Sequence, residues 1–124
     1  MNPTDRKYTK SHEWLMEVPG GYRIGLTDFA QSSLGDIVFV GLPAVDDAVT
    51  AEASFGDVES VKAVSEMLSP VSGTVMAVNE DLLVAPENVN VTPYEAWLIE
   101  VSGVTETAEL LDAAAYEALC AAEA

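Results

Sequence analysis

The chain has 124 residues, 49% of them hydrophobic, and a formal net charge of −16. A chain of this length and composition is one globular domain that buries its own core. Its five basic residues, set against 21 acidic ones, exclude the clustered lysines and arginines that binding to nucleic acid or an anionic membrane requires. The negative field favours partners with basic docking faces, although a halophilic source would produce the same acidity.

The cysteine content and the start of the chain indicate the compartment. A single cysteine excludes an intrachain disulfide, so nothing points to an oxidising compartment. The polar and charged start lacks the apolar core of a signal peptide, and no apolar run approaches the length of a membrane span. We therefore expect a cytoplasmic protein without a membrane segment, and we discount the glycosylation sequon at Asn90-Val91-Thr92. We also expect a monomer.

Hydrophobic alternation and turn residues divide the chain into short strands. We expect residues 1–7 to form a flexible leader ahead of a single domain at 8–124. The segment 36–40 is apolar throughout, which predicts a strand buried on both faces. Residues 79–93 are expected to be mostly connection. The other predicted strands, in chain order, are 8–9, 12–18, 22–26, the two arms around Lys62, 73–78 and 97–102.

Two helices are predicted. Thr27 or Asp28 as cap and Gly35 as stop predict a short helix at 28–34. A longer helix at about 105–122 would begin at a Thr cap followed by acidic residues. Its expected core-facing stripe is Leu111, Ala115, Ala118, Leu119 and Ala122. The elements together predict a mainly β fold, a small antiparallel sandwich or flattened barrel with a short helix and a C-terminal α-helix.

Lys62 stands apart from the other basic residues. From residue 24 to the end of the chain it is the only one. It lies between two short apolar strands, in a reversal at 59–63 that contains none of the usual turn residues Gly, Asn, Asp or Pro. A reversal without the usual turn residues departs from local sequence preference, and such departures are expected at functional sites. An amine at a hairpin tip suits covalent attachment, whereas a lysine base needs desolvation, which the flanking Glu59 and Glu66 oppose. The alternative interpretation is a solvated surface lysine.

The residues around Lys62 match a known motif. The segment 58–65 reads VESVKAVS and is followed by SPVSG at 69–73. Together they resemble the lipoyl-lysine motif of the glycine cleavage system H proteins. The resemblance runs from about Tyr8 to Val101, in the family's order and spacing. Its further blocks are SHEW at 11–14, IGLTDFAQ at 24–31, LGDIVFV at 34–40, LP at 42–43, VNE at 78–80, PY at 93–94 and WLI at 97–99.

The resemblance implies a fold. It is the barrel-sandwich hybrid that lipoyl and biotinyl carrier domains share, with the modified lysine at a hairpin tip and two half-sheets related by a pseudo-twofold axis. A weak internal repeat agrees with this arrangement, since 35–40 (GDIVFV) and 73–78 (GTVMAV) are both strands led by Gly, one on each side of Lys62.

The resemblance also implies a function, that of a non-catalytic carrier with lipoate in amide linkage to Lys62. The arm would take up the aminomethyl group left when glycine is decarboxylated by the pyridoxal-phosphate enzyme (the P protein). It would present that group to the folate-dependent aminomethyltransferase (the T protein) and be reoxidised by dihydrolipoamide dehydrogenase (the L protein). A lipoate ligase or lipoyltransferase would attach the cofactor.

Several residues take roles by the same resemblance. Glu13 would contact the amine of the loaded arm. Phe29 stands where some members carry a His that shelters the arm, so Phe29 would supply apolar cover instead. The residues expected to guide the attaching enzyme to Lys62 are Glu59, Ser60, Val61 and Ala63.

Other interpretations of the chain stay open. The same scaffold could donate lipoate to other lipoyl proteins, or serve as an unmodified β-rich interaction module that tolerates Lys62→Arg. A biotin carrier has Met on both sides of its lysine, where this chain has Val61 and Ala63. His12 is the only histidine, and one His with one Cys cannot supply a zinc site, so a structural or surface role is expected. No pattern in the chain proposes catalysis of its own.

Overall fold

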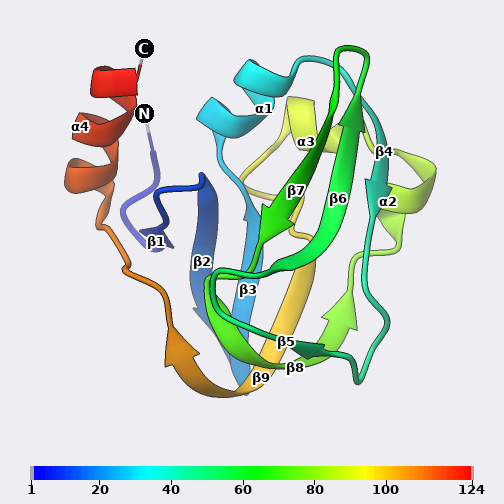
Figure 1. Ribbon diagram of the computed structural model, residues 1–124, viewed down its shortest axis with the longest axis vertical. Helices are drawn as coiled ribbons and strands as arrows, with labels where there is room; N and C mark the ends of the chain where they lie inside the picture. The colour runs from blue at the N-terminus through cyan, green and yellow to red at the C-terminus, as the bar shows by residue number, and fades with distance from the viewer. Residues whose placement is uncertain (1, 124) are drawn as a thin grey trace.

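The computed structural model describes residues 2–123, and Met1 and Ala124 lie outside this range. Two antiparallel sheets form the body of the molecule (Figure 1), one ordered β1-β2-β3-β9-β8-β5 and the other β4-β6-β7. The elements are β1 (Lys7–Tyr8), β2 (Glu13–Val18), β3 (Gly21–Leu26), α1 (Asp28–Leu34), β4 (Ile37–Gly41), β5 (Ala48–Val49), β6 (Ser54–Ser60), β7 (Val64–Leu68), β8 (Val71–Val78), α2 (Asp81–Val84), α3 (Asn88–Val91), β9 (Ile99–Thr107) and α4 (Ala113–Glu123). The mainly β prediction is confirmed.

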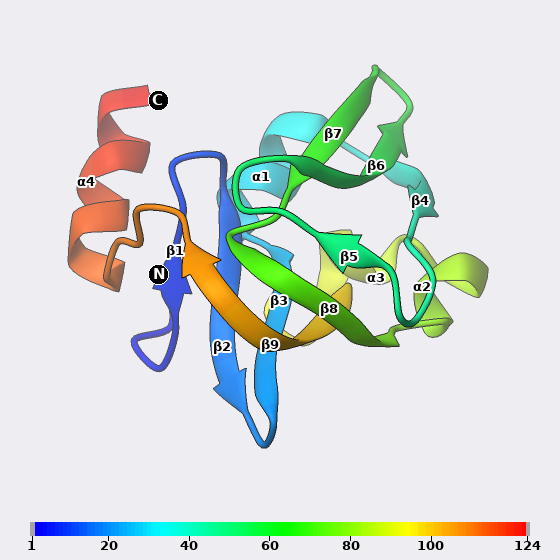
Figure 2. The same ribbon diagram turned by 60° about the horizontal axis from the view of Figure 1, so that its bottom comes forward.

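The two sheets enclose one main apolar core, and a smaller core lies under α4. The main core contains inward-facing side chains of both sheets, such as Ile24, Val40, Val58 and Val75. The smaller one is formed by the buried residues Tyr8, Trp14, Ala113 and Tyr116. In both views α4 lies beside β1, while the β6–β7 hairpin projects from the body, with α1 between it and α4 (Figures 1 and 2). The hairpin tip is therefore left open to partners.

Helix α1 forms as predicted. Thr27 is its N-cap, and the Thr27 hydroxyl accepts a hydrogen bond from the amide of Ala30. Gly35 ends the helix with φ of 84°, a left-handed conformation that favours glycine, and its N–H donates to the Gln31 carbonyl. The hairpin predicted over 12–18 and 22–26 is confirmed as β2 and β3, paired from Glu13 and Leu26 to Val18 and Gly21.

The expectation that the strand at 36–40 is buried on both faces was wrong. In β4, Ile37 and Val40 face the core, whereas Val38 and Phe39 are 54% and 48% exposed. The strand lies at the edge of the three-stranded sheet, and only one face of that sheet meets the core. An apolar run in the sequence does not reveal that its second face lacks a covering layer.

The C-terminal helix begins later than predicted. Residues 105–107 belong to β9, because they pair with the start of β8 (Val71 with Thr107, Ser72 with Glu106). Asp112 caps α4 instead of a Thr, since its carboxylate accepts the amide of Ala115. The helix buries Ala113 and Tyr116. Of the predicted stripe, Leu111 and Leu119 pack partly buried against the smaller core, whereas Ala115, Ala118 and Ala122 are exposed. A tyrosine ring buries far more apolar area than alanine, and it stacks on Tyr8 with ring centres 4.7 Å apart.

Two further boundaries differ from expectation. Strand β1 begins at Lys7, the last residue of the predicted leader, and the Arg6 guanidinium lies over the rings of Trp14 and Tyr94. The predicted leader also includes Met1, which is outside the described residues. The connection at 79–93 contains the single-turn helices α2 and α3. Within residues 2–123, every helix is too short or too polar to cross a bilayer.

Candidate functional site

The reversal that carries Lys62 is closed by Ser60. The amide of Ser60 donates to the Ala63 carbonyl at 2.8 Å, which leaves Val61 and Lys62 as the loop. The Ser60 hydroxyl accepts the amides of Lys62 (3.1 Å) and Ala63 (3.2 Å). A hydroxyl that bonds nearby backbone amides stabilises a turn without a left-handed residue, and none of these four has positive φ. This explains how the chain turns here without Gly, Asn or Asp.

Lys62 is exposed, and its stem lies against the end of α1. The Lys62 Cε is 3.0 Å from the point that a Cβ on Gly35 would occupy, so the missing side chain of Gly35 leaves room for the lysine. The amide of Val61 donates to the Asp36 carbonyl at 3.0 Å and ties the tip to the start of β4. Among residues 2–123, no carboxylate lies within ion-pair distance of Lys62. The backbone and stem of Lys62 are thus held in place, while its amino group is free of ion pairs with the described residues.

Glu59 lies on the outer face of the three-stranded sheet. It pairs with Phe39 on one side and with Val64 on the other, and both neighbours are exposed apolar residues. The adjacent Val58 faces the core. The predicted residues Glu59, Ser60, Val61 and Ala63 thus share one hairpin with Lys62, and Glu59 offers a carboxylate between two apolar side chains.

Glu13 is buried and is held from three directions. It is 2% exposed. Its Oε1 accepts hydrogen bonds from the hydroxyls of Thr9 (2.8 Å) and Ser11, and its Oε2 accepts the amide of Leu68 at 3.2 Å. Burial raises the pKa of the Glu13 carboxyl, while the hydrogen bonds from Ser11, Thr9 and Leu68 act to lower it. The hydrogen bonds fix the position of the carboxyl at the start of β2.

A cavity of about 160 Å³ connects the Glu13 region with the hairpin. Leu34 lies next to Gly35, on which the stem of Lys62 rests. Ser65 is three residues from Lys62, roughly 10 Å along a strand. The cavity is mixed in character, since apolar side chains and two carboxyls line it. Its lining residues are Ser11, His12, Glu13, Leu26, Ala30, Ser33, Leu34, Val58, Ser65, Glu66 and Met67.

Sequence reasoning missed the α1 wall of this cavity. Ala30, Ser33 and Leu34 come from the helix, and their spacing of three and four residues could have indicated a shared face. Phe29 is not among the lining residues. Its ring stacks on His12 with centres 4.6 Å apart. Leu26, Ala30 and Leu34 are among the apolar side chains that line the cavity.

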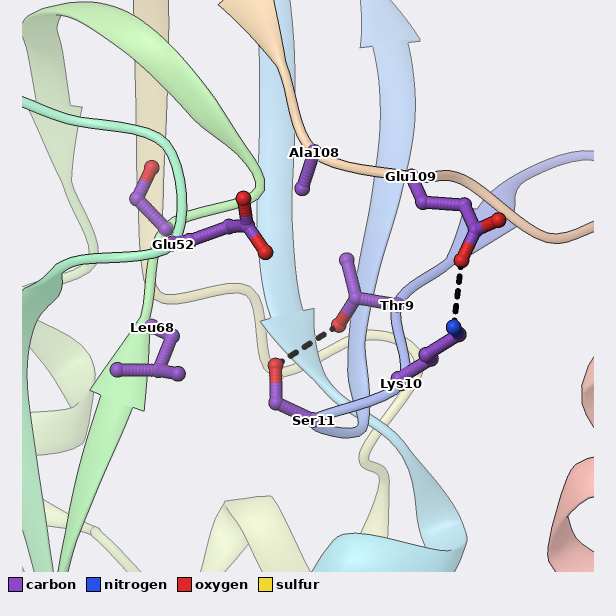
Figure 3. A pocket seen from close by; sticks show the side chains of 8 residues that line it. Thr9, Lys10, Ser11, Glu52, Leu68, Ala108 and Glu109 are labelled. Atoms are coloured by element: carbon purple, nitrogen blue, oxygen red, sulfur yellow. Dashed lines mark hydrogen bonds and ion pairs between the residues drawn. The ribbon is translucent and has the colours of Figure 1, made fainter.

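A second cavity, of about 200 Å³, lies at the other end of the hairpin (Figure 3). The ion pair between Lys10 and Glu109, 2.7 Å long, spans its rim. Thr9, Ser11 and Leu68 line it, and these are the residues that hydrogen-bond to Glu13. Because Leu68 is six residues from Lys62, this cavity is farther from the hairpin tip than the first one. The residues it shares with the Glu13 site hold the Glu13 carboxyl, and the cavity lies away from the Lys62 amine.

We expect Glu13→Gln to gain stability relative to the wild type as the pH rises. A carboxyl whose pKa is raised in the folded state contributes stability below its ordinary pKa of about 4.3, and that contribution is lost as the pH rises through the folded-state pKa. The amide that replaces the carboxyl in the variant has no such titration. Urea unfolding of both proteins between about pH 4 and pH 8 measures the difference. A difference independent of pH would contradict the burial effect.

Glu109→Gln serves as the control for this prediction. Its exposed carboxyl has a pKa lowered by the hydrogen bond and charge of Lys10. The stability difference is therefore expected to change with pH in the opposite direction, and to be small because the pair is solvated.

His12 has a structural role, as expected. Its Nδ1 is 2.7 Å from the Tyr116 hydroxyl and its Nε2 is 2.9 Å from a Glu123 carboxylate oxygen. The Tyr116 hydroxyl also lies 2.6 Å from the Thr27 hydroxyl. These contacts anchor α4 to the loop ahead of β2 and to the cap of α1.

Known proteins of one family match this chain over nearly its whole length. The family model described as glycine cleavage H-protein matches residues 6–123. The chain is 53% identical over 124 residues to the glycine cleavage system H protein of Koribacter versatilis, covering 98% of this chain and 96% of that one. It is also 53% identical over 118 residues to the probable glycine cleavage system H protein of Natronomonas pharaonis, covering 94% of each.

A solved structure agrees as well. The crystal structure of a glycine cleavage system H protein from Mycobacterium marinum superposes with a TM-score of 0.89 at 41% identity, covering 94% of this chain and 97% of that one. The expected barrel-sandwich hybrid fold is thereby confirmed. The chain belongs to the glycine cleavage H-protein family.

Proposed function

We propose that this protein carries lipoate in amide linkage on Lys62 and serves the glycine cleavage system as a non-catalytic carrier. The observation that carries the proposal is the exposed amine of Lys62, which has no ion-pair partner among the described residues. It lies at the tip of a hairpin whose backbone there is tied to Asp36. Family membership supports the same function.

The residues around Lys62 fit an acyl chain that ends in an apolar ring. The exposed amino group of Lys62 is accessible to the attaching enzyme. The hydrogen bonds of the Ser60 hydroxyl hold the backbone of the tip in one conformation. Apolar side chains of Leu26, Ala30 and Leu34 line the cavity beside the hairpin. When bound, lipoate supplies a disulfide that takes up the aminomethyl group of glycine and yields it to the next enzyme.

Glu13 has the geometry to bind an amine in this cavity. Its carboxyl is fixed by three hydrogen bonds and lines the same space as the helix α1 side chains. A carboxylate there would pair with an ammonium group, and the surrounding side chains would exclude water from that pair. Glu13 would thus hold the charged end of the cargo and protect it between visits to the enzymes.

The partners follow from this role and from the charge of the chain. They are glycine decarboxylase, aminomethyltransferase, dihydrolipoamide dehydrogenase and a lipoate ligase or lipoyltransferase, all in the cytoplasm, with the carrier as a monomer. Its net charge of −16 would speed the encounter with basic docking faces. Glu59 and the turn residues Ser60, Val61 and Ala63 would guide the attaching enzyme to Lys62.

Intact mass spectrometry after incubation with lipoate ligase, ATP and lipoate tests the proposal. We expect one lipoyl adduct per chain, and peptide mapping should locate it at Lys62. No adduct on a protein shown by circular dichroism to be folded would contradict the carrier function. The relay alternative is separated by adding a lipoyltransferase and an apo-acceptor, because only a relay donor would then lose lipoate from Lys62.

A further inference from the structure

Asn90, on α3, joins two segments that are far from it in the sequence. Its side-chain Nδ2 donates to the Gln31 Oε1 and to the Gly35 carbonyl, both at 2.9 Å. Its Oδ1 accepts the amide of Ile37 at 2.8 Å. The side chain thus uses both donors and its acceptor, which is close to the full capacity of an amide group.

The groups that Asn90 binds flank the turn from α1 to β4. Gly35 ends the helix in a left-handed conformation, and Ile37 begins the strand, where a register shift separates it from Phe39. A helix end leaves carbonyls without partners inside the helix, and a shifted register leaves strand groups without regular ladder partners. Asn90 supplies a partner to each, so its side chain bridges the two ends of this turn.

The tip that carries Lys62 rests on the same turn. Val61 donates its amide to the carbonyl of Asp36, the residue between the two that Asn90 holds. The Cε of Lys62 lies over Gly35. The chain of contacts therefore runs from Asn90 through Gly35 and Ile37 to Asp36, and from there to the backbone next to Lys62.

We propose that Asn90 is a positioning residue for Lys62, acting through the α1–β4 turn to hold the hairpin tip in the orientation that the attaching enzyme accepts. The enzymological part of this inference rests on the proposed lipoyl-carrier function, whereas the placement of the tip does not. Asn90 is also the first residue of the sequon Asn90-Val91-Thr92. Its Nδ2 is engaged in two hydrogen bonds, which gives this asparagine a structural role.

The test compares Asn90→Asp with Asn79→Asp. The carboxylate introduced by Asn90→Asp can still accept the Ile37 amide, but it cannot donate and would face the Gly35 carbonyl. Asn79 is a matched control because it is also half-buried, donates its Nδ2 to the Trp97 carbonyl (2.8 Å) and accepts the Asp81 amide (3.3 Å), away from the hairpin.

Amide hydrogen exchange measured by NMR is the direct readout. We expect the Val61 amide to exchange about ten-fold faster in Asn90→Asp, the factor that corresponds to losing one hydrogen bond, with the β2–β3 amides unchanged. Asn79→Asp should leave Val61 unchanged. Equal Val61 exchange in the wild type and Asn90→Asp would overturn the proposal. If Asn90→Asp does not fold, Asn90→Ser removes the same donor bonds without adding charge, and the same criterion applies.

Kinetics of lipoate attachment give the second readout. We expect the KM of the ligase for Asn90→Asp to rise several-fold with little change in kcat, because the tip samples other orientations before docking. A lower kcat with unchanged KM, or no change at all, would overturn the positioning role. If the wild type itself accepts no lipoate, the carrier function fails, and the exchange measurement alone still decides whether Asn90 orders the tip.

Discussion

Lys62→Arg is expected to accept no lipoate under conditions in which the wild type gains one adduct per chain. Attachment needs an amine that can lose a proton and attack an activated acyl group. The guanidinium of arginine stays protonated in proteins, with a pKa above about 12, so it cannot serve as that nucleophile. Arginine retains the positive charge and the apolar stem that lies against Gly35. The loss should therefore be complete while the fold is unchanged, and intact mass measures it.

Lys10→Arg is the matched control for this experiment. Lys10 is also exposed, but it is engaged in an ion pair with Glu109 and lies at the opposite end of the hairpin region. That variant should gain the same adduct as the wild type. An adduct on Lys62→Arg would show that attachment does not depend on Lys62. Equal loss of the adduct in both variants would show that the loss is not specific to Lys62.

Trp14→Ala is expected to lower the free energy of unfolding by about 3–5 kcal/mol, as large-to-small changes at buried aromatic positions do. Trp14 has no exposed surface, and its indole N–H donates to the Pro93 carbonyl at 3.0 Å. Arg6 covers the ring at 4.6 Å from its centre. The backbone of Gly25 packs so closely on the ring that an added Cβ would lie 2.4 Å from it. Urea unfolding followed by circular dichroism measures the loss.

Trp97→Ala provides the comparison. Trp97 is half-buried, and Arg23 lies over its ring at 4.9 Å. A ring that keeps part of its surface in water loses less on truncation, so this variant should be clearly more stable than Trp14→Ala. Equal losses in the two variants would contradict the argument that the extent of burial sets the size of the loss.

The sequence predicted the local elements with good success where short-range chemistry decides them. The Thr27 cap and the Gly35 stop act within a single helix, so α1 was predicted at its observed bounds. The β2–β3 hairpin followed from alternation on either side of a Pro-Gly-Gly turn. Lys62 was singled out by its isolation and by the absence of turn residues around it, and the bonds of Ser60 now explain that absence.

The misplaced C-terminal helix shows where short-range signals are insufficient. Residues 105–107 can be read as a capped helix start, but their local preference for helix over strand is weak. Pairing with β8, a partner about 35 residues earlier in the chain, supplies ladder hydrogen bonds that outweigh the local preference. The helix then begins at Ala113 after the Asp112 cap, and its Tyr116 stacks on Tyr8.

By itself the sequence determined the helix and hairpin near the start, the mainly β class and the isolation of Lys62, because these depend on residue types and spacing within a few positions. Only the tertiary structure decided the exposure of β4, the burial of Glu13 and the cavity that the β6–β7 hairpin shares with α1. It alone revealed the bonds from Asn90 to the turn beneath Lys62. Each of these depends on which distant segment covers a surface or bonds to a polar group. The spacing of residues along the chain does not specify that segment.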